Sequence, residues 1–163
     1  MNPDHYIDML SQFPILEHQS PYLNHAAVGP WPRCTAEAAQ AFAEENMRHG
    51  SNNYLEWMER EKRLRTNLAQ MTGASSSDDI ALLKNTTECI CAVAEGLDWK
   101  PGDNVVLPAE EFPSNRLPWL AQSKRGVEAR EVDIRRADNA EQALLDAMDS
   151  NTRLLTVSSV QWN

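Results

Sequence analysis

The chain has 163 residues, and 42% of them are hydrophobic, which is enough to build the core of one domain or of part of a larger one. Its formal net charge of −9 would repel a nucleic-acid backbone or an anionic membrane surface, so neither is expected as a partner. Residues 1–5 lack the basic and apolar runs of a secretory signal, and no segment reaches the length of a membrane span, which predicts a cytoplasmic protein.

The first part of the chain is predicted to be mainly helical. In chain order we expect a short helix over 4–13, an extended piece over 22–24, a rigid turn over 29–32, and two long helices over 35–48 and 54–71. Thr35 is the expected N-cap of the first long helix, which ends before Gly50. The second long helix carries an apolar stripe and is expected to stop at Gly73.

From residue 80 onward, short apolar strands alternate with helices. The predicted strands are 80–83, 105–107, 127–132 and 153–160, and the predicted helices between them are 86–97, 114–124 and 140–148. This alternation predicts an α/β fold with a mainly parallel sheet that is covered on both faces. The chain stops just after a strand of buried type, where such folds usually continue, so we expect an apparently truncated domain or one part of a two-chain protein.

The cysteines and histidines predict neither a disulfide framework nor a metal site. There are three cysteines, Cys34, Cys89 and Cys91, and their odd number is typical of a reducing compartment. Cys89 and Cys91 do not share a helix face, so we expect small buried side chains there. The four histidines are scattered without the spacing of metal ligands.

The run Asn-Thr-Thr-Glu at residues 85–88 lies where a predicted strand gives way to a helix. A helix start offers free backbone N–H groups and a partial positive charge, and the hydroxyls of Thr86 and Thr87 add two further donors. The run is therefore a candidate phosphate-binding site. The alternative is that one threonine simply caps the helix.

Four stretches in collinear order resemble the motifs of one known family. Residues 22–30 resemble Y-L-[DN]-x-A-A, residues 85–88 resemble G-T-T-E, residues 102–115 resemble G-D-x-[IV]-[IV]-x-x-x-x-[EH]-[HF]-x-[SA]-N, and residues 152–162 resemble T-[RK]-L-[LV]-x-[IV]-S-x-V. Together they resemble the class V aminotransferases, a group of enzymes that depend on pyridoxal 5'-phosphate (PLP). That group includes cysteine desulfurases, selenocysteine lyases and isopenicillin-N-epimerase-like proteins.

The resemblance implies the PLP-dependent transferase fold of type I, of which this chain would be the N-terminal part. Residues 1–50 would form an N-terminal helical segment, and residues 51–163 would form the first, incomplete part of the PLP-binding large domain. Relatives are dimers with active sites near the interface, so a homodimer or a complementing chain is the expected partner. In the complete protein the expected substrate is an amino acid.

The resemblance also assigns roles to single residues. Thr86 and Thr87 would bind the PLP phosphate, and Phe112 would stack on the pyridine ring, where many relatives have histidine. Phenylalanine cannot transfer a proton, and a core position is the alternative for this side chain. Asn115 is expected to anchor its own loop rather than to touch PLP.

Gln161 and Trp162 stand where desulfurases carry Ser-Asn of an H-V-S-N run, whose asparagine approaches the ring hydroxyl of the cofactor. Both are candidate cofactor-binding residues, and the Gln-Trp pair resembles the epimerase-like branch more than the desulfurases. Asn24 and His25 lie in a segment that passes over the active site in relatives, which makes them candidate substrate-binding residues. A surface or structural role is the alternative for these two.

PLP chemistry needs a lysine that holds the cofactor and an aspartate that pairs with the pyridine nitrogen. In the family both follow the last motif, so they would come after Asn163. None of the four lysines here, Lys62, Lys84, Lys100 and Lys124, has the family's lysine context. We therefore expect no catalytic residue in this chain, and no activity of the chain alone. The alternatives are a phosphate-binding module and a non-enzymatic subunit that pairs with a second chain.

Overall fold

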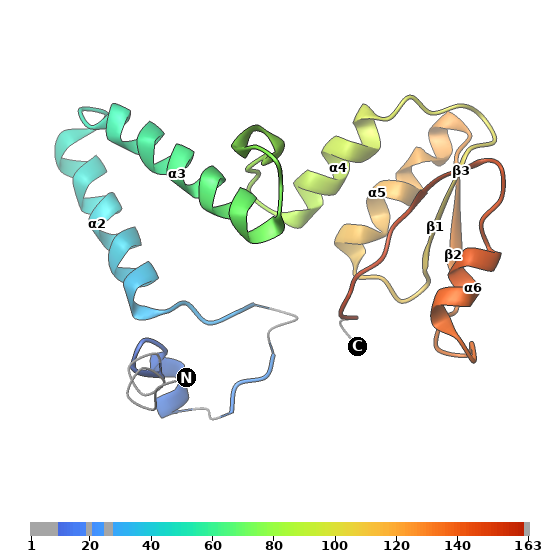
Figure 1. The fold of residues 1–163 in the computed structure, drawn as a ribbon, viewed down its shortest axis with the longest axis horizontal. Helices are drawn as coiled ribbons and strands as arrows, with labels where there is room; N and C mark the ends of the chain where they lie inside the picture. The colour runs from blue at the N-terminus through green and yellow to red at the C-terminus, as the bar shows by residue number, and fades with distance from the viewer. Residues whose placement is uncertain (1–9, 19–20, 25–27, 162–163) are drawn as a thin grey trace. The chain divides into compact units, whose positions relative to one another are not determined.

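A computed structural model describes residues 10–18, 21–24 and 28–161 of the chain (Figure 1). The chain divides into two compact units, Met1–Leu82 and Leu83–Asn163, which are described one at a time. None of the helices in the described part of the chain has the length and apolar character that a membrane span requires. The predicted boundary between residues 50 and 51 stays a prediction.

The first unit is helical, as the sequence predicts. Its elements are the 3-10 helix η1 (Pro14–Glu17), the helices α2 (Arg33–His49) and α3 (Tyr54–Thr72), and the 3-10 helix η2 (Ser77–Asp79). Helix α2 begins two residues earlier than predicted, and Pro32 rather than Thr35 is its N-cap. Because the φ of Pro32 is −66° and its carbonyl oxygen accepts from the amides of Thr35 and Ala36, the proline itself starts the helix.

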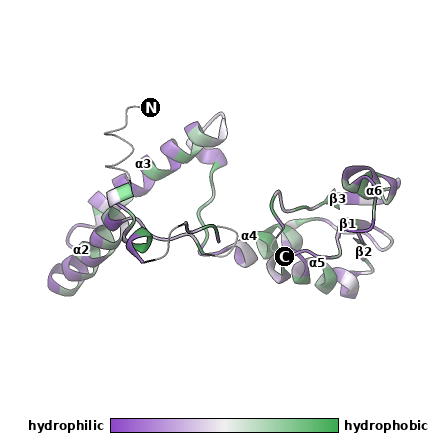
Figure 2. Cartoon of the chain, turned by 90° about the horizontal axis from the view of Figure 1, so that it is seen from below, coloured by the Kyte–Doolittle hydropathy of each residue, from purple (hydrophilic) through white to green (hydrophobic). Residues whose placement is uncertain are grey.

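Helices α2 and α3 contact each other through aromatic rings. The ring centroids of Phe42 and Trp57 are 5.2 Å apart in an edge-to-face arrangement, and the Trp57 Nε1–H donates to Glu45 at 2.9 Å. Hydrogen bonds from Asn53 and Trp57 lower the pKa of Glu45. Trp57 is therefore a packing anchor between the two helices. Figure 2 shows hydrophilic and hydrophobic residues alternating along both helices.

Gly73 ends α3 in the left-handed region at φ 73°, as predicted. The strand predicted over residues 80–83 is wrong. The Ile80 carbonyl oxygen accepts from Arg65 Nη1 at 2.5 Å, and the amide of Ile80 donates to the carbonyl of Ser77. Because Arg65 and a local turn occupy the polar groups of Ile80, this segment forms no strand ladder among the described residues.

The second unit contains the predicted parallel sheet (Figure 1). Its strands are β1 (Asn104–Pro108), β2 (Glu128–Val132) and β3 (Thr152–Leu155), in the order β2-β1-β3, and β1 pairs in parallel with both neighbours. Every residue of β1 is buried, whereas β2 and β3 are partly exposed at the edges. The central strand therefore fits the prediction of a sheet covered on both faces, and the two outer strands do not.

Helices α4 (Thr86–Gly96) and α6 (Ala140–Asp146) agree with the prediction to within two residues at each end. The apolar core joins α4, the sheet and the segment after β1. It consists of Ala94, Val105, Leu107, Trp119 and Val127, with Ile90, Trp99, Ala129 and Leu154 packed against it. Trp119 is 2% exposed and is thus a core residue.

The helix predicted over residues 114–124 is broken into three short pieces. They are η3 (Pro113–Asn115), α5 (Leu117–Leu120) and η4 (Ala121–Arg125). Pro113 and Pro118 stand at the starts of the first two pieces, and a proline has no amide to continue a helical ladder from the preceding turn. Pro118 lies inside the predicted range, near the start of α5, whereas Pro113 precedes that range and α5 passes directly into η4.

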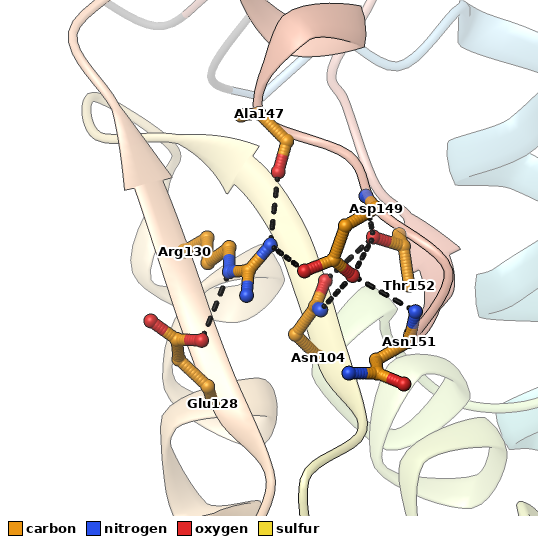
Figure 3. Close-up of polar contacts among 7 residues, drawn as sticks. All are labelled: Asn104, Glu128, Arg130, Ala147, Asp149, Asn151 and Thr152. Atoms are coloured by element: carbon orange, nitrogen blue, oxygen red, sulfur yellow. Dashed lines mark hydrogen bonds and ion pairs between the residues drawn. The ribbon is translucent and has the colours of Figure 1, made fainter.

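A polar network lies at the start of β1 and ties the three strands together (Figure 3). The Asn104 side chain donates to Asp149 at 2.8 Å and accepts from Thr152 at 2.7 Å. Asp149 also pairs with Arg130 of β2 at 2.7 Å. Hydrogen bonds from Asn104, Arg130 and the amide of Asn151 lower the pKa of Asp149 to about 2. The carboxyl of Asp149 is thus ionised at neutral pH, and its contacts hold the ends of the strands together.

Candidate functional site

The candidate phosphate site is the start of α4. Asn85 is extended, and its Oδ1 accepts from the amide of Glu88 at 2.9 Å, so Asn85 is the cap of the helix. The alternative that Thr86 or Thr87 caps the helix is therefore wrong. Because Asn85 serves as the cap, the two threonine hydroxyls remain available to another partner.

Thr86 and Thr87 are both exposed, and they occupy the first two positions of an eleven-residue helix. Their backbone N–H groups have no partner within the helix because a helical amide bonds to the carbonyl four residues earlier. The carboxylate of Glu88 is turned back onto Lys84, accepting from its amide at 2.9 Å and pairing with its ammonium at 4.0 Å. The helix start thus presents amides and hydroxyls suited to an anion.

Thr87 and Phe112 line one shallow pocket of about 360 Å³, although they lie far apart in the sequence. The complete lining is Thr87, Cys91, Phe112, Pro113, Ser114, Leu117, Pro118 and Ala121. The Phe112 side chain is 50% exposed, so the alternative of a core aromatic is wrong. Most of the lining is apolar, and Thr87 at the start of α4 is part of it, which suits a flat ring that carries an anionic group.

The other predicted site residues are not among those that line this pocket. Thr86 and Gln161 lie in the same unit but outside the lining, and Asn24 is exposed in the first unit. The carbonyl oxygen of Asn24 accepts from the Tyr22 hydroxyl at 3.3 Å. His25 and Trp162 lie outside the described residues.

Sequence reasoning missed Glu111, which organises the end of the sheet that carries Phe112. Glu111 is only 3% exposed, and its carboxylate accepts from the Ser158 amide at 2.5 Å and from the Ser158 hydroxyl at 2.7 Å. Burial raises the pKa of Glu111, but hydrogen bonds from Ser158, Asn115 and Gln161 together bring it below its usual value. A carboxylate three residues after the end of a buried parallel strand was the available signal, since ligand sites gather at that edge.

This contact also explains why β3 is shorter than the predicted strand 153–160. The Thr156 amide still donates to the Val106 carbonyl of β1 at 3.0 Å, but the Ser158 amide is used by Glu111. The ladder cannot continue once a side chain takes its next donor. The chain after β3 is therefore held by the loop that follows β1.

Gln161 belongs to the same cluster. Its Nε2 donates to Glu111 Oε1 and to the Ser158 carbonyl, at 3.3 Å in each case. Its Oε1 is buried and has no hydrogen-bond partner within the described ranges. A buried carbonyl oxygen without a donor is costly, so this atom is suited to accept from a bound molecule.

Contacts also decide the roles of Asn115 and Arg116. Asn115 anchors its own loop, as predicted, because its amide donates to the Phe112 carbonyl at 2.8 Å and its Oδ1 accepts from Thr156 at 2.6 Å. Arg116 forms a bidentate ion pair with Glu131, and this raises the pKa of the guanidinium. Arg116 is therefore engaged within the protein.

The predicted burial of Cys89 and Cys91 is wrong, because Cys91 is exposed and Cys89 is only half-buried; Cys34 is exposed as well. Cys91 is exposed because it faces the pocket beside Thr87 rather than the sheet. A second hollow of about 370 Å³ on α3 is lined by Leu55, Glu56, Glu59, Arg60 and Arg63, where none of the four motifs falls. Over the described ranges, no group of side chains is arranged to hold a metal ion.

Comparison with known proteins gives the family of the chain. The model of the aminotransferase class-V family matches residues 21–162. A probable cysteine desulfurase of Methanothermobacter thermautotrophicus is 34% identical over 157 residues, which are 94% of this chain and 39% of that protein. The chain thus spans about two fifths of the length of this relative.

Two solved structures share the fold. A C-DES variant with glycine covalently linked to its PLP cofactor is 25% identical and gives a TM-score of 0.81 over 99% of this chain and 42% of that one. The cysteine desulfurase CsdA of Escherichia coli is 25% identical, with a TM-score of 0.70 over 95% of this chain and 40% of that one. These likenesses confirm the predicted type I fold and the resemblance drawn from the motifs. The chain belongs to the aminotransferase class-V family.

Proposed function

We propose that this chain is part of a PLP-dependent enzyme that acts on an amino-acid substrate, and that the start of α4 binds the cofactor phosphate. The observation that carries the proposal is the shared pocket of Thr87 and Phe112, which joins an anion-binding helix start to an exposed aromatic face. Family membership supports the same assignment. When bound, PLP supplies an electron sink for the bonds at the substrate α-carbon.

The residues present fit the two ends of this cofactor. The amides and hydroxyls of Thr86 and Thr87 would hold the phosphate, which needs donors and a positive field. Phe112 would pack against the ring and exclude water from its face. Phe112 has no group that can accept or donate a proton, so another residue would have to carry out any proton transfer at this position.

Gln161 and Trp162 would contact the cofactor at the edge remote from the phosphate. The buried Gln161 Oε1, which has no donor among the described residues, supports this role because it would accept from a ring hydroxyl. Asn24 and His25 would contribute to binding of the amino-acid substrate. The complete assembly would be a homodimer or a pair of complementing chains in the cytoplasm.

We further propose that this chain alone does not turn over an amino acid, because none of its four lysines stands in the family's lysine context. Incubation with PLP followed by borohydride reduction is expected to give no stoichiometric adduct at one lysine. Peptide mapping by mass spectrometry measures this directly. A full adduct at a single lysine, together with turnover of an amino acid, would overturn the claim.

Binding itself is tested by titrating the chain with PLP and following the absorbance of the cofactor. Thr87→Val is expected to weaken PLP binding by about tenfold, since a hydrogen bond to a charged group is worth roughly 1.5–3 kcal/mol. Thr66→Val is the matched control, because Thr66 is exposed on α3 and donates to its own helix at Lys62. Pyridoxal without phosphate should bind weakly to both variants and to the parent chain.

Occupancy of the pocket can be followed by thiol alkylation. Cys91 lines the pocket, so bound PLP should slow its alkylation, whereas the exposed Cys34 in the first unit should react at an unchanged rate. Adenosine monophosphate tests the alternative of a general phosphate-binding module. Stronger protection of Cys91 by the nucleotide than by PLP would contradict the proposed function.

A further inference from the structure

Glu111 joins two segments that carry proposed cofactor contacts. The first is the loop after β1 that holds Phe112, and the second is the segment after β3 that holds Gln161. Glu111 is next to Phe112 in the chain, and its carboxylate binds both the amide and the hydroxyl of Ser158. The two segments are 47 residues apart in the sequence at these atoms, so this side chain joins parts of the chain that local backbone structure does not connect.

The carboxylate is suited to this task because it is buried and multiply bonded. With 3% of the residue exposed, water cannot replace the contacts from Ser158 and Gln161. Hydrogen bonds to ionised groups are shorter and roughly twice as strong as those between neutral groups. Loss of the charge would leave the partly buried N–H of Ser158 facing a weaker acceptor.

Gln161 depends on the same carboxylate. Its Nε2 is shared between Glu111 Oε1 and the Ser158 carbonyl, and this orients the amide so that Oε1 is the remaining acceptor. In the absence of Glu111 the amide could rotate and exchange its oxygen and nitrogen. The direction of the one available acceptor is therefore set by Glu111.

We propose that Glu111 is a positioning residue, which fixes Phe112 and Gln161 relative to each other on the ring side of the cofactor site. This inference rests on the proposed function. Glu111 does not touch the start of α4, where the phosphate would bind, so its effect should be confined to the ring. Affinity for PLP and affinity for inorganic phosphate should therefore respond differently to its substitution.

The test compares Glu111→Gln with Glu141→Gln, which makes the same change of charge at an exposed position in the first turn of α6. Glu111→Gln is expected to weaken PLP binding by about tenfold, in line with one hydrogen bond to a charged group, and to leave the affinity for inorganic phosphate within about twofold. Glu141→Gln should alter neither affinity. Equal losses for PLP and phosphate in Glu111→Gln would overturn the positioning role.

A second measurement needs no cofactor. Hydrogen exchange at the Ser158 amide should be about tenfold faster in Glu111→Gln than in Glu141→Gln, since that amide loses its charged acceptor. Unchanged exchange would overturn the positioning role whatever the affinities are. If the parent chain binds no PLP, the proposed function fails, while the exchange experiment still decides whether Glu111 holds the two segments together.

A double-mutant cycle with Ser158→Ala makes the test specific. Removing the Ser158 hydroxyl deletes one of its two bonds to Glu111 and leaves the amide bond. The effects of Glu111→Gln and Ser158→Ala on PLP affinity should be clearly less than additive, because they remove a shared contact. Additive effects would show that the two residues act separately and would contradict the proposal.

Discussion

The Thr156 hydroxyl donates a hydrogen bond of 2.6 Å to Oδ1 of Asn115, and this joins the loop after β1 to the chain that leaves β3. Asn115 is 8% exposed, and the same oxygen accepts from Trp119 of the core at 3.3 Å. A single buried amide thus connects the candidate site to the apolar interior. The contact joins the same two segments as that of Glu111 and Ser158, so two side chains hold them together.

Thr156→Val is expected to destabilise the second unit by about 1 kcal/mol, because it removes one partly buried hydrogen bond while keeping the shape of the side chain. Urea unfolding followed by tryptophan fluorescence measures the effect, since Trp119 reports on its neighbour Asn115. Thr152→Val is not a suitable control because Thr152 bonds to Asn104, so Thr66→Val on α3 serves instead. A parent-like midpoint for Thr156→Val would contradict the stabilising role of this bond.

Asn104→Ala is expected to cost about 1–3 kcal/mol of unfolding free energy, since it leaves the partner groups of Asp149 and Thr152 without their bonds. Asn151→Ala is the matched control. Asn151 is exposed, and it binds Asp149 and Asn104 through its backbone amide and carbonyl, which alanine retains. Equal midpoints for the two variants in urea would show that the network of Figure 3 adds no stability.

Acid should weaken the second unit between about pH 4 and pH 2. The folded pKa of Asp149 is lowered from 3.8 to about 2, so its contribution to stability is present above the unfolded value and is lost as the pH falls through the folded one. Asp149→Asn should therefore have a flatter pH dependence of stability in this window. Asp138→Asn, at an exposed position, should keep the steep dependence of the parent chain. Parallel curves for the two variants would refute the assignment.

Asn85→Ala is expected to destabilise α4 by about 1 kcal/mol, as is typical when an N-cap is removed. Asn85→Ser should retain most of the stability because its hydroxyl can accept from the same amide of Glu88. Hydrogen exchange at the Glu88 amide gives the local readout. Equal losses for alanine and serine would argue that the cap is not the stabilising feature.

Gly126→Ala should be more destabilising than Gly102→Ala. Both glycines have positive φ, 78° and 95°, so alanine incurs a backbone penalty of roughly 1–2 kcal/mol at either position. A Cβ at Gly126 would also lie 3.2 Å from Pro101, whereas a Cβ at Gly102 would meet nothing within 4 Å. Thermal unfolding of the two variants measures the difference. A larger loss for Gly102→Ala would contradict the close approach at Pro101.

Much of this protein follows from local sequence signals. The alternation of apolar strands and helices predicts the parallel sheet, because each buried strand must be covered by a crossover helix. The run at residues 85–87 marks the start of α4, and Gly73 marks the end of α3, since caps and left-handed glycines act within one turn. Pro113 and Pro118 are local signals too, since they stand at the starts of η3 and α5.

The tertiary structure alone decided what depends on contacts across the chain. Residues 80–83 form no strand because Arg65 donates a hydrogen bond to the carbonyl of Ile80. Strand β3 ends early because the amide of Ser158 donates to the carboxylate of Glu111. The tertiary structure also brought Thr87 and Phe112 to one pocket. Periodicity and caps act over a few residues, so they specify elements. The pairing of a buried carboxylate with a distant amide is set by how those elements pack, and no local pattern contains it.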